Sequence, residues 1–153
     1  MISTSCSRLG AAAMIAAVLA GPGYAAQYLE PTNAQRSYGA GVVTEGGRIV
    51  WLAGMGGTVA ADGKKIVDFA GQTRRAFQNI EAALKRAGGS LDNVVSMTVM
   101  IRNQADGDEF VRIRGELFHD RYPASMLITA KDFANPDLLV EIQSVAVIGD
   151  QLR

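Results

Sequence analysis

Glu141 is a carboxylate placed inside an apolar run near the end of the sequence, between Val140 and Ile142. A carboxylate in such surroundings needs hydrogen-bond donors, because burial otherwise disfavours its charged form. When it lies beside a pocket, it can act as a general base or hold a water molecule. A structural ion pair with an arginine, or a hydrogen bond between subunits, is the alternative interpretation. Both interpretations are open at this point, and Glu141 is the main candidate for chemistry.

Two further positions could face a ligand. Tyr38 is followed by Gly39 and Gly41, and its hydroxyl could line a cleft, although such a tyrosine is more often a half-buried strand residue. The run 53–57, which includes Gly54, is rich in glycine but matches neither nucleotide-binding fingerprint, since it lacks the third glycine of G-x-G-x-x-G and the lysine of a P-loop. We interpret this run as a tight turn whose backbone N–H groups could face a small anion.

Composition excludes several other kinds of site. The 153 residues include one histidine, His119, and one cysteine, Cys6, which disfavours a structural metal site, a disulfide framework and a hydrolytic serine triad. Basic and acidic residues both total 15, so a strongly basic nucleic-acid-binding surface is not expected. With 48% apolar residues, the chain has the composition and length of one compact domain.

The N-terminal segment has the features of a secretory signal peptide. Arg8 is the only charged residue before Glu30, and the apolar stretch 9–20 ends at Gly-Pro-Gly. Gly23 and Ala25 then offer small residues at −3 and −1 for cleavage before Ala26. A membrane-spanning helix needs about 20 apolar residues, so an anchor is the weaker interpretation. We therefore expect residues 1–26 to contain the signal peptide and its cleavage site, residues 27–153 to form one domain, and the protein to be periplasmic or secreted, without a membrane partner.

The elements that must position these residues follow from apolar periodicity. Residues 40–53 predict a hairpin around a glycine turn, and residues 68–87 predict a helix with Asp68 as its N-cap. A strand over 94–101 and a helix from Asp106 or Asp108 to Arg121 come next, followed by strands over 125–130 and 138–148. The order β-β-α-β-α-β-β, with one apolar stripe on each helix, predicts an α+β sheet with both helices on one face. The opposite face would hold Trp51, Met97 and Val145, and a partner subunit would have to cover it.

Several segments together resemble the RidA (YjgF) family. They are Gln72–Leu84, Ala87-Gly88, Asn93–Val99, Tyr122–Ser125 and Leu138–Val147. The resemblance implies a chorismate-mutase-like α+β fold and a homotrimer whose sheets form a central barrel. It also implies clefts between subunits that bind small carboxylates, and in the deaminase subgroup hydrolyse enamines and imines without a metal or organic cofactor. Some members have been labelled endoribonucleases, translation inhibitors or chaperone-like proteins.

The resemblance also assigns roles to single residues. Tyr38 matches the family's pocket tyrosine, Gly54 the glycine of its Ser-Gly turn, and Glu141 the glutamate that positions the hydrolytic water. Ser125 stands where the deaminase subgroup has the arginine that clamps the substrate carboxylate, and a hydroxyl cannot replace a bidentate guanidinium. With a short gap near 106–109, Arg114 falls at the position of a pocket asparagine and could supply the missing cation. An ungapped alignment places Val111 there, and Arg114 could instead pair with a helix-surface carboxylate.

The expected function is therefore hydrolysis of a small reactive imine or enamine in a cleft between subunits. Glu141 and Tyr38 would be the catalytic residues, and Gly54, Arg114 and Ser125 would bind the substrate. The alternative is a small-molecule-binding protein, a sensor or chaperone-like member that turns nothing over. Ser125 favours this alternative and Glu141 opposes it.

Overall fold

The computed structural model describes residues 26–29, 33–119 and 121–149. The expected signal peptide, residues 1–26, lies outside the described residues except for its last residue. Within the described part, no helix is both long and apolar enough to cross a membrane.

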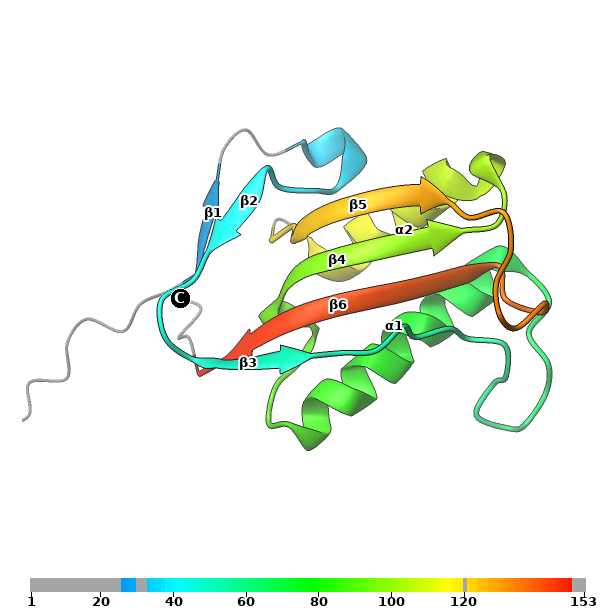
Figure 1. The fold of residues 1–153 in the computed structure, drawn as a ribbon, viewed down its shortest axis with the longest axis horizontal. Helices are drawn as coiled ribbons and strands as arrows, with labels where there is room; N and C mark the ends of the chain where they lie inside the picture. The colour runs from blue at the N-terminus through cyan, green and yellow to red at the C-terminus, as the bar shows by residue number, and fades with distance from the viewer. Residues whose placement is uncertain (1–25, 30–32, 120, 150–153) are drawn as a thin grey trace, which may run out of the picture.

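A four-stranded sheet is the centre of the fold (Figure 1). Its order is β3-β6-β4-β5, with β4 and β5 parallel and the other neighbours antiparallel. The strands are β3 (Arg48–Trp51), β4 (Val94–Ile101), β5 (Ala124–Thr129) and β6 (Val140–Ile148). Two further strands, β1 (Gln27–Leu29) and β2 (Gly41–Val43), pair with each other in a separate antiparallel sheet. The described part of the chain also has three short 3-10 helices: η1 (Ala34–Arg36), η2 (Leu91–Asn93) and η3 (Gln104–Asp106).

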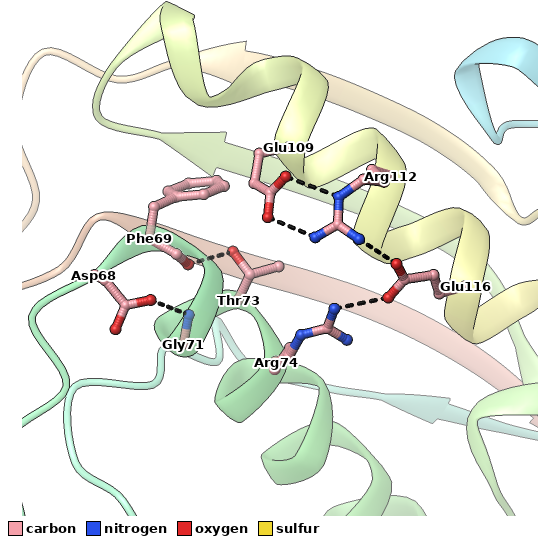
Figure 2. Close-up of polar contacts among 8 residues, drawn as sticks. All are labelled: Asp68, Phe69, Gly71, Thr73, Arg74, Glu109, Arg112 and Glu116. Atoms are coloured by element: carbon pink, nitrogen blue, oxygen red, sulfur yellow. Dashed lines mark hydrogen bonds and ion pairs between the residues drawn. The ribbon is translucent and has the colours of Figure 1, made fainter.

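Both helices, α1 (Phe69–Arg86) and α2 (Gly107–Phe118), cover the same face of this sheet (Figure 1). The helix α1 begins where Asp68 accepts a hydrogen bond from the backbone N–H of Gly71 at 2.7 Å, as an N-cap does (Figure 2). Its apolar stripe carries Phe77, whose ring stacks against Phe110 of α2 at 6.0 Å. The core therefore lies between the helices and the sheet.

A chain of ion pairs joins the exposed surfaces of the two helices (Figure 2). Arg112 binds both carboxylate oxygens of Glu109, with N–O distances of 2.7 and 2.9 Å, and also contacts Glu116. Glu116 in turn accepts from Arg74 of α1 at 2.7 Å. Because these groups are exposed, the network orients the helices more than it stabilises the fold.

Two details of the predicted topology are wrong. The hairpin over 40–53 does not form, because β2 pairs with β1 and β3 pairs with β6. Gly46 and Gly47 do adopt the left-handed conformation of a turn, so the turn was correctly identified but its strands diverge to other partners. The second predicted helix ends at Phe118, before Arg121, because His119 has a left-handed φ of 51°.

The face of the sheet away from the helices is partly as expected. Trp51 is 74% exposed and pairs with Val145, which is half-buried on the same face. Met97 is instead buried among the helix-facing residues, so its predicted place on the open face is wrong. The reason is that Val99 and Ile101 share its side of β4, while Ser96 and Thr98 turn outward.

Candidate functional site

Glu141 lies on the open face of β6. Its neighbours Val140 and Ile142 are fully buried under the helices, so strand alternation turns the Glu141 side chain to the other face, where it is half-buried. Across the sheet it pairs with Met100 of β4. No hydrogen bond or ion pair engages its carboxylate within the described residues.

The turn that follows β3 brings Gly54 against this carboxylate. Met55 and Ile142 exchange backbone hydrogen bonds of 2.9 and 3.0 Å, which fixes the turn beside β6. A β-carbon at Gly54 would lie 2.8 Å from Cδ of Glu141 and 3.1 Å from its Cγ, so only glycine leaves room for this carboxylate. In the described part of the chain the N–H of Gly54 donates to no backbone oxygen. Among the residues that the structure describes, the Gly54 N–H has no acceptor and the adjacent Glu141 carboxylate has no donor.

The helix α1 holds this turn in place. Asn79 donates its side-chain N–H to the carbonyl of Gly56 at 2.8 Å. Gly57 packs on the helix so closely that a β-carbon there would lie 2.9 Å from the backbone nitrogen of Ala76. The buried amide of Gln72 donates to the carbonyls of Ile66 and Asp137 and accepts from the N–H of Leu139, each at 2.9 Å. The segments that lead out of the turn and into β6 are thus tied to one helix.

Arg114 and Ser125 meet on the helix side of the sheet. Arg114 in α2 is only 2% exposed, and its guanidinium donates to the Ser125 hydroxyl and, at 2.5 Å, to the carbonyl of Arg36. It also lies 5.2 Å from the ring centre of Phe110, while its Nε finds no partner among the described residues. Burial, and then the nearby charge of Arg36, lower the pKa of Arg114 to about 10, so the group stays protonated at neutral pH.

Tyr38 reaches the same region through the segment that follows η1. Ser37 has a left-handed φ of 55° and is held there by a hydrogen bond from its hydroxyl to the carbonyl of Val111, at 3.1 Å. Gly115 makes space for it, since a β-carbon there would lie 2.8 Å from the Ser37 hydroxyl. Tyr38 is consequently placed at the start of β5, where it shares with Ser125 a shallow cavity of about 340 Å³. A larger open cavity of about 750 Å³ lies further along the same strand.

The predicted site residues thus form two groups. Gly54 and Glu141 are together on the open face, and Tyr38, Arg114 and Ser125 are together beside α2. Ser125 of β5 pairs with Met97 of β4, and Met97 pairs on its other side with Ser144 of β6. Ser144 is three residues from Glu141, so two strand spacings and three residues of strand put the backbones of Ser125 and Glu141 on the order of 14 Å apart. Their side chains also point to opposite faces, and within one chain the two groups do not meet around one small ligand.

Two supporting residues were not identified from the sequence. Gln72 and Asn79 are polar residues on α1 whose side chains bind the backbone of the loops that carry the site. Gln72 lies within the apolar stripe of the helix, and a buried amide in such a stripe is the signal that could have revealed it. The described residues contain no group of three or more histidine, cysteine or acidic side chains arranged to hold a metal ion.

Comparisons with known proteins identify a family model that matches this chain and a relative that is described as a deaminase. The family model described as "Endoribonuclease L-PSP" matches residues 30–148. The protein described as 3-aminoacrylate deaminase RutC from Acinetobacter baylyi is 35% identical over 79 residues, which cover 52% of this chain and 62% of that protein. A RutC family protein from Pyrococcus horikoshii is 32% identical over 79 residues, with the same coverage of 52% and 62%. The match therefore spans less than two thirds of these relatives.

Solved structures resemble the whole domain. A member of the conserved Rid protein family from Yersinia pestis superposes with a TM-score of 0.72 at 22% identity, covering 80% of this chain and 98% of that one. A member of the YjgF family from Mycobacterium tuberculosis has a TM-score of 0.60 at 26% identity, covering 81% and 100%. The α+β fold expected from the sequence is confirmed by these likenesses.

Proposed function

This chain belongs to the RidA (YjgF) family, whose model is described as endoribonuclease L-PSP, and from that premise we propose that it hydrolyses the C=N bond of a small imine or its enamine tautomer. The observation that carries this proposal is the Glu141 carboxylate next to the backbone of Gly54, since within the described part of the chain neither this carboxylate nor the Gly54 N–H has a hydrogen-bond partner. A deaminase among the relatives is consistent with it.

The reaction needs one water and one proton carrier. Glu141 holds the water and takes a proton from it as the oxygen bonds to the imine carbon. Starting from the protonated imine, this addition gives a neutral carbinolamine, and Glu141 returns its proton to the amine nitrogen. Glu141 then takes the proton of the new hydroxyl group as the C–N bond breaks, which gives ammonia and a ketone or aldehyde. In this proposal the N–H of Gly54 donates a hydrogen bond to the ligand and fixes its orientation. No metal or organic cofactor is required by this sequence of steps.

We further propose that the complete site forms between subunits of a homotrimer. The sheet face that carries Glu141 also exposes Ile49, Trp51, Met126 and Ile128, and a large exposed apolar face of this kind favours association. One subunit would contribute Glu141 and Gly54, and its neighbour Tyr38, Arg114 and Ser125. This division explains how two groups on opposite faces of one chain can serve one ligand.

The cellular setting is proposed from the sequence. Residues 1–26 direct export, the mature protein is periplasmic or secreted, and it works on a small molecule without nucleic acid or membrane as partner. N-terminal sequencing of the protein recovered from the periplasm or medium tests the cleavage. An N-terminus still at Met1 in the cytoplasmic fraction contradicts it.

Ammonia release is the test of the reaction. The purified protein is offered 3-aminoacrylate, 2-iminopropanoate and 2-iminobutanoate, each generated in the assay, and ammonia is followed over the buffer rate. We expect a clear rate that Glu141→Gln lowers by at least about 100-fold, since a general base contributes roughly 10²–10⁴. Glu45→Gln is the matched control, because Glu45 is an exposed glutamate outside both groups. A rate equal to buffer with all three compounds refutes the reaction for this substrate class.

The second candidate function is binding without turnover. It is favoured by Ser125, which removes the arginine clamp of the deaminase subgroup. A ligand that raises the melting temperature and is recovered chemically unchanged supports it. Recovery of the corresponding ketone or aldehyde and ammonia supports hydrolysis.

A further inference from the structure

The carboxylate of Glu141 is bounded by a turn on one side of its strand and by β4 on the other. The turn that carries Gly54 lies on the β3 side of β6, where Met55 and Ile142 exchange backbone hydrogen bonds. Strand β4 runs along the opposite side of β6, with β5 beyond it (Figure 1). The turn therefore leaves the β4 side for a ligand whose reacting carbon lies at Glu141.

Two apolar residues continue the position of Glu141 across the sheet. Met100 of β4 pairs directly with Glu141, and Ile128 of β5 pairs in turn with Met100. Directly opposite residues of an antiparallel pair share one face, with their Cβ atoms about 4.5–5.5 Å apart. Met100 is half-buried and Ile128 is 42% exposed, on the face away from the helices. We call Met100 and Ile128 the apolar row.

The polar residues that flank the apolar row are bound to backbone groups. By strand alternation, Arg102 and Gln143 are the next side chains on this face of β4 and β6. The guanidinium of Arg102 donates to the carbonyl of Leu138 at 2.8 Å and to that of Pro136 at 3.2 Å. The amide of Gln143 donates to the carbonyl of Leu52 at 3.4 Å. Both groups thus hold neighbouring loops, and the surface next to the carboxylate on the β4 side is apolar.

A methionine beside the reacting group favours an apolar ligand chain of variable shape. Its side chain is unbranched and has three rotatable bonds, so it adapts to the group that packs on it. Its thioether is uncharged and accepts hydrogen bonds only weakly, so apolar contact is what it offers to a ligand. Each methylene group that a ligand buries against such a surface raises its affinity about fourfold.

We propose that the apolar row selects the substrate, and that Met100 contacts an unbranched aliphatic side chain of three or more carbons on the imine or enamine. The inference rests on the proposed function, because it places the reacting carbon at Glu141. It adds the kind of side chain that the substrate carries, which is longer than that of 2-iminopropanoate or 2-iminobutanoate. Met100 is a specificity-determining residue and takes no part in proton transfer.

Binding of 2-oxo acids of increasing length to the full-length protein tests this inference. Calorimetry compares pyruvate, 2-oxobutanoate, 2-oxopentanoate and 2-oxohexanoate, which are stable products of the proposed reaction and need no turnover. For the wild-type protein we expect the Kd to fall about fourfold with each added carbon, or roughly 60-fold over the series. Damage to the fold would weaken all four acids alike, so this dependence on length separates ligand contact from a structural role.

Variants of Met100 assign the dependence on length to this side chain. Met100→Gln keeps the length of the side chain but makes its end polar, and the gain should drop below about twofold for each carbon. Met100→Leu keeps an apolar side chain of similar volume and should retain the gain. If Met100→Gln does not fold, Met100→Thr replaces it, since threonine is polar and suits a strand. Val67→Gln is the control, because Val67 is 74% exposed and lies before α1, outside the sheet.

The outcomes separate this inference from the proposed reaction. Equal affinity for all four acids in the wild-type protein overturns it, and so does a lack of measurable binding to any of them. A gain that persists in the polar variant of Met100, or is lost in Val67→Gln, overturns it as well. A steep series without ammonia release from any imine establishes the apolar row as a binding surface and refutes the reaction. Ammonia release with a flat series supports the reaction and refutes the role of Met100.

Discussion

Replacing Gly54 by alanine tests whether the space at this glycine is what places the Glu141 carboxylate. The new β-carbon would lie 2.8 Å from Cδ and 3.1 Å from Cγ of Glu141, and nearer still to Oε1. Carbon atoms in favourable contact are about 3.5–4.0 Å apart, so the carboxylate must retreat by about 1 Å. Gly54 is not among the glycines with positive φ, and alanine therefore adds no backbone strain there.

The same displacement has very different consequences for stability and for rate. Glu141 can retreat by turning its side-chain torsions, at a cost of about 1 kcal/mol. A reacting group misplaced by 1 Å lowers a rate by about 100-fold. We therefore expect Gly54→Ala to melt within about 5 °C of the wild-type protein and to release ammonia from the best imine substrate about 100-fold more slowly.

A second glycine and a double mutant make this result interpretable. Gly107→Ala is the matched control, because its β-carbon would meet Leu127 and Ile101 only at 3.8 and 3.9 Å, and it should leave the rate unchanged. In the double mutant Gly54→Ala/Glu141→Gln, the rate should equal that of Glu141→Gln alone, since both changes act through one carboxylate. A Gly54→Ala enzyme with wild-type rate refutes the reasoning, and so does a loss that adds fully to that of Glu141→Gln.

Three further changes test other parts of the structure. Gln72→Leu should lower the free energy of unfolding in urea by about 3 kcal/mol, because it removes three buried hydrogen bonds of about 1 kcal/mol each; a loss below about 1 kcal/mol would mean that water replaces the amide. Hydrogen bonding to Arg112 lowers the pKa of Glu109, so its stabilising effect is present above the unfolded-state pKa and disappears as the pH falls through the lower folded value. The melting temperature of the wild-type protein should accordingly exceed that of Glu109→Gln at neutral pH and match it in strong acid, and a constant difference across the range contradicts this. Trp51→Asp should convert the proposed trimer to a monomer in light scattering, whereas a wild-type monomer at micromolar concentration refutes the two-subunit site.

Much of the fold could be predicted because its signals are local. The helix α1 was expected over 68–87 and spans Phe69–Arg86, since Asp68 caps its start and Gly88 takes a left-handed φ of 83° after its end. The hairpin over 40–53 failed for the opposite reason. Its glycine turn is real, but the strand partner of Arg48–Trp51 is the last strand of the chain, and no local pattern encodes a pairing across almost 100 residues.

The residues of the candidate site could likewise be predicted from local sequence, but their contacts with distant residues could not. Glu141 was recognisable because a carboxylate interrupts an apolar strand, but its contact with Gly54 depends on how the turn crosses β6. Arg114 and Ser125 are only eleven residues apart, yet their meeting depends on the helix ending at Phe118 rather than continuing to Arg121. The sequence pattern favoured the longer helix, so the hydrogen bond between Arg114 and Ser125 was not expected.

The position of Arg114 also bears on how the two proposed functions can be told apart. A guanidinium in place of Ser125 would stand on the strand itself, whereas the buried guanidinium of Arg114 reaches this strand only through the Ser125 hydroxyl. In the proposed site, a substrate carboxylate held by a single hydroxyl would be free to rotate, which would weaken the orientation of the C=N carbon toward the water at Glu141. Weak orientation lowers the rate more than the affinity. A protein of this kind should therefore bind 2-oxo acids measurably even if its turnover is slow, and exchanging the two residues, in Ser125→Arg/Arg114→Asn, should raise the rate of ammonia release relative to the affinity for pyruvate. An exchange that improves binding but not the rate would show that Glu141, not the carboxylate contact, limits the reaction.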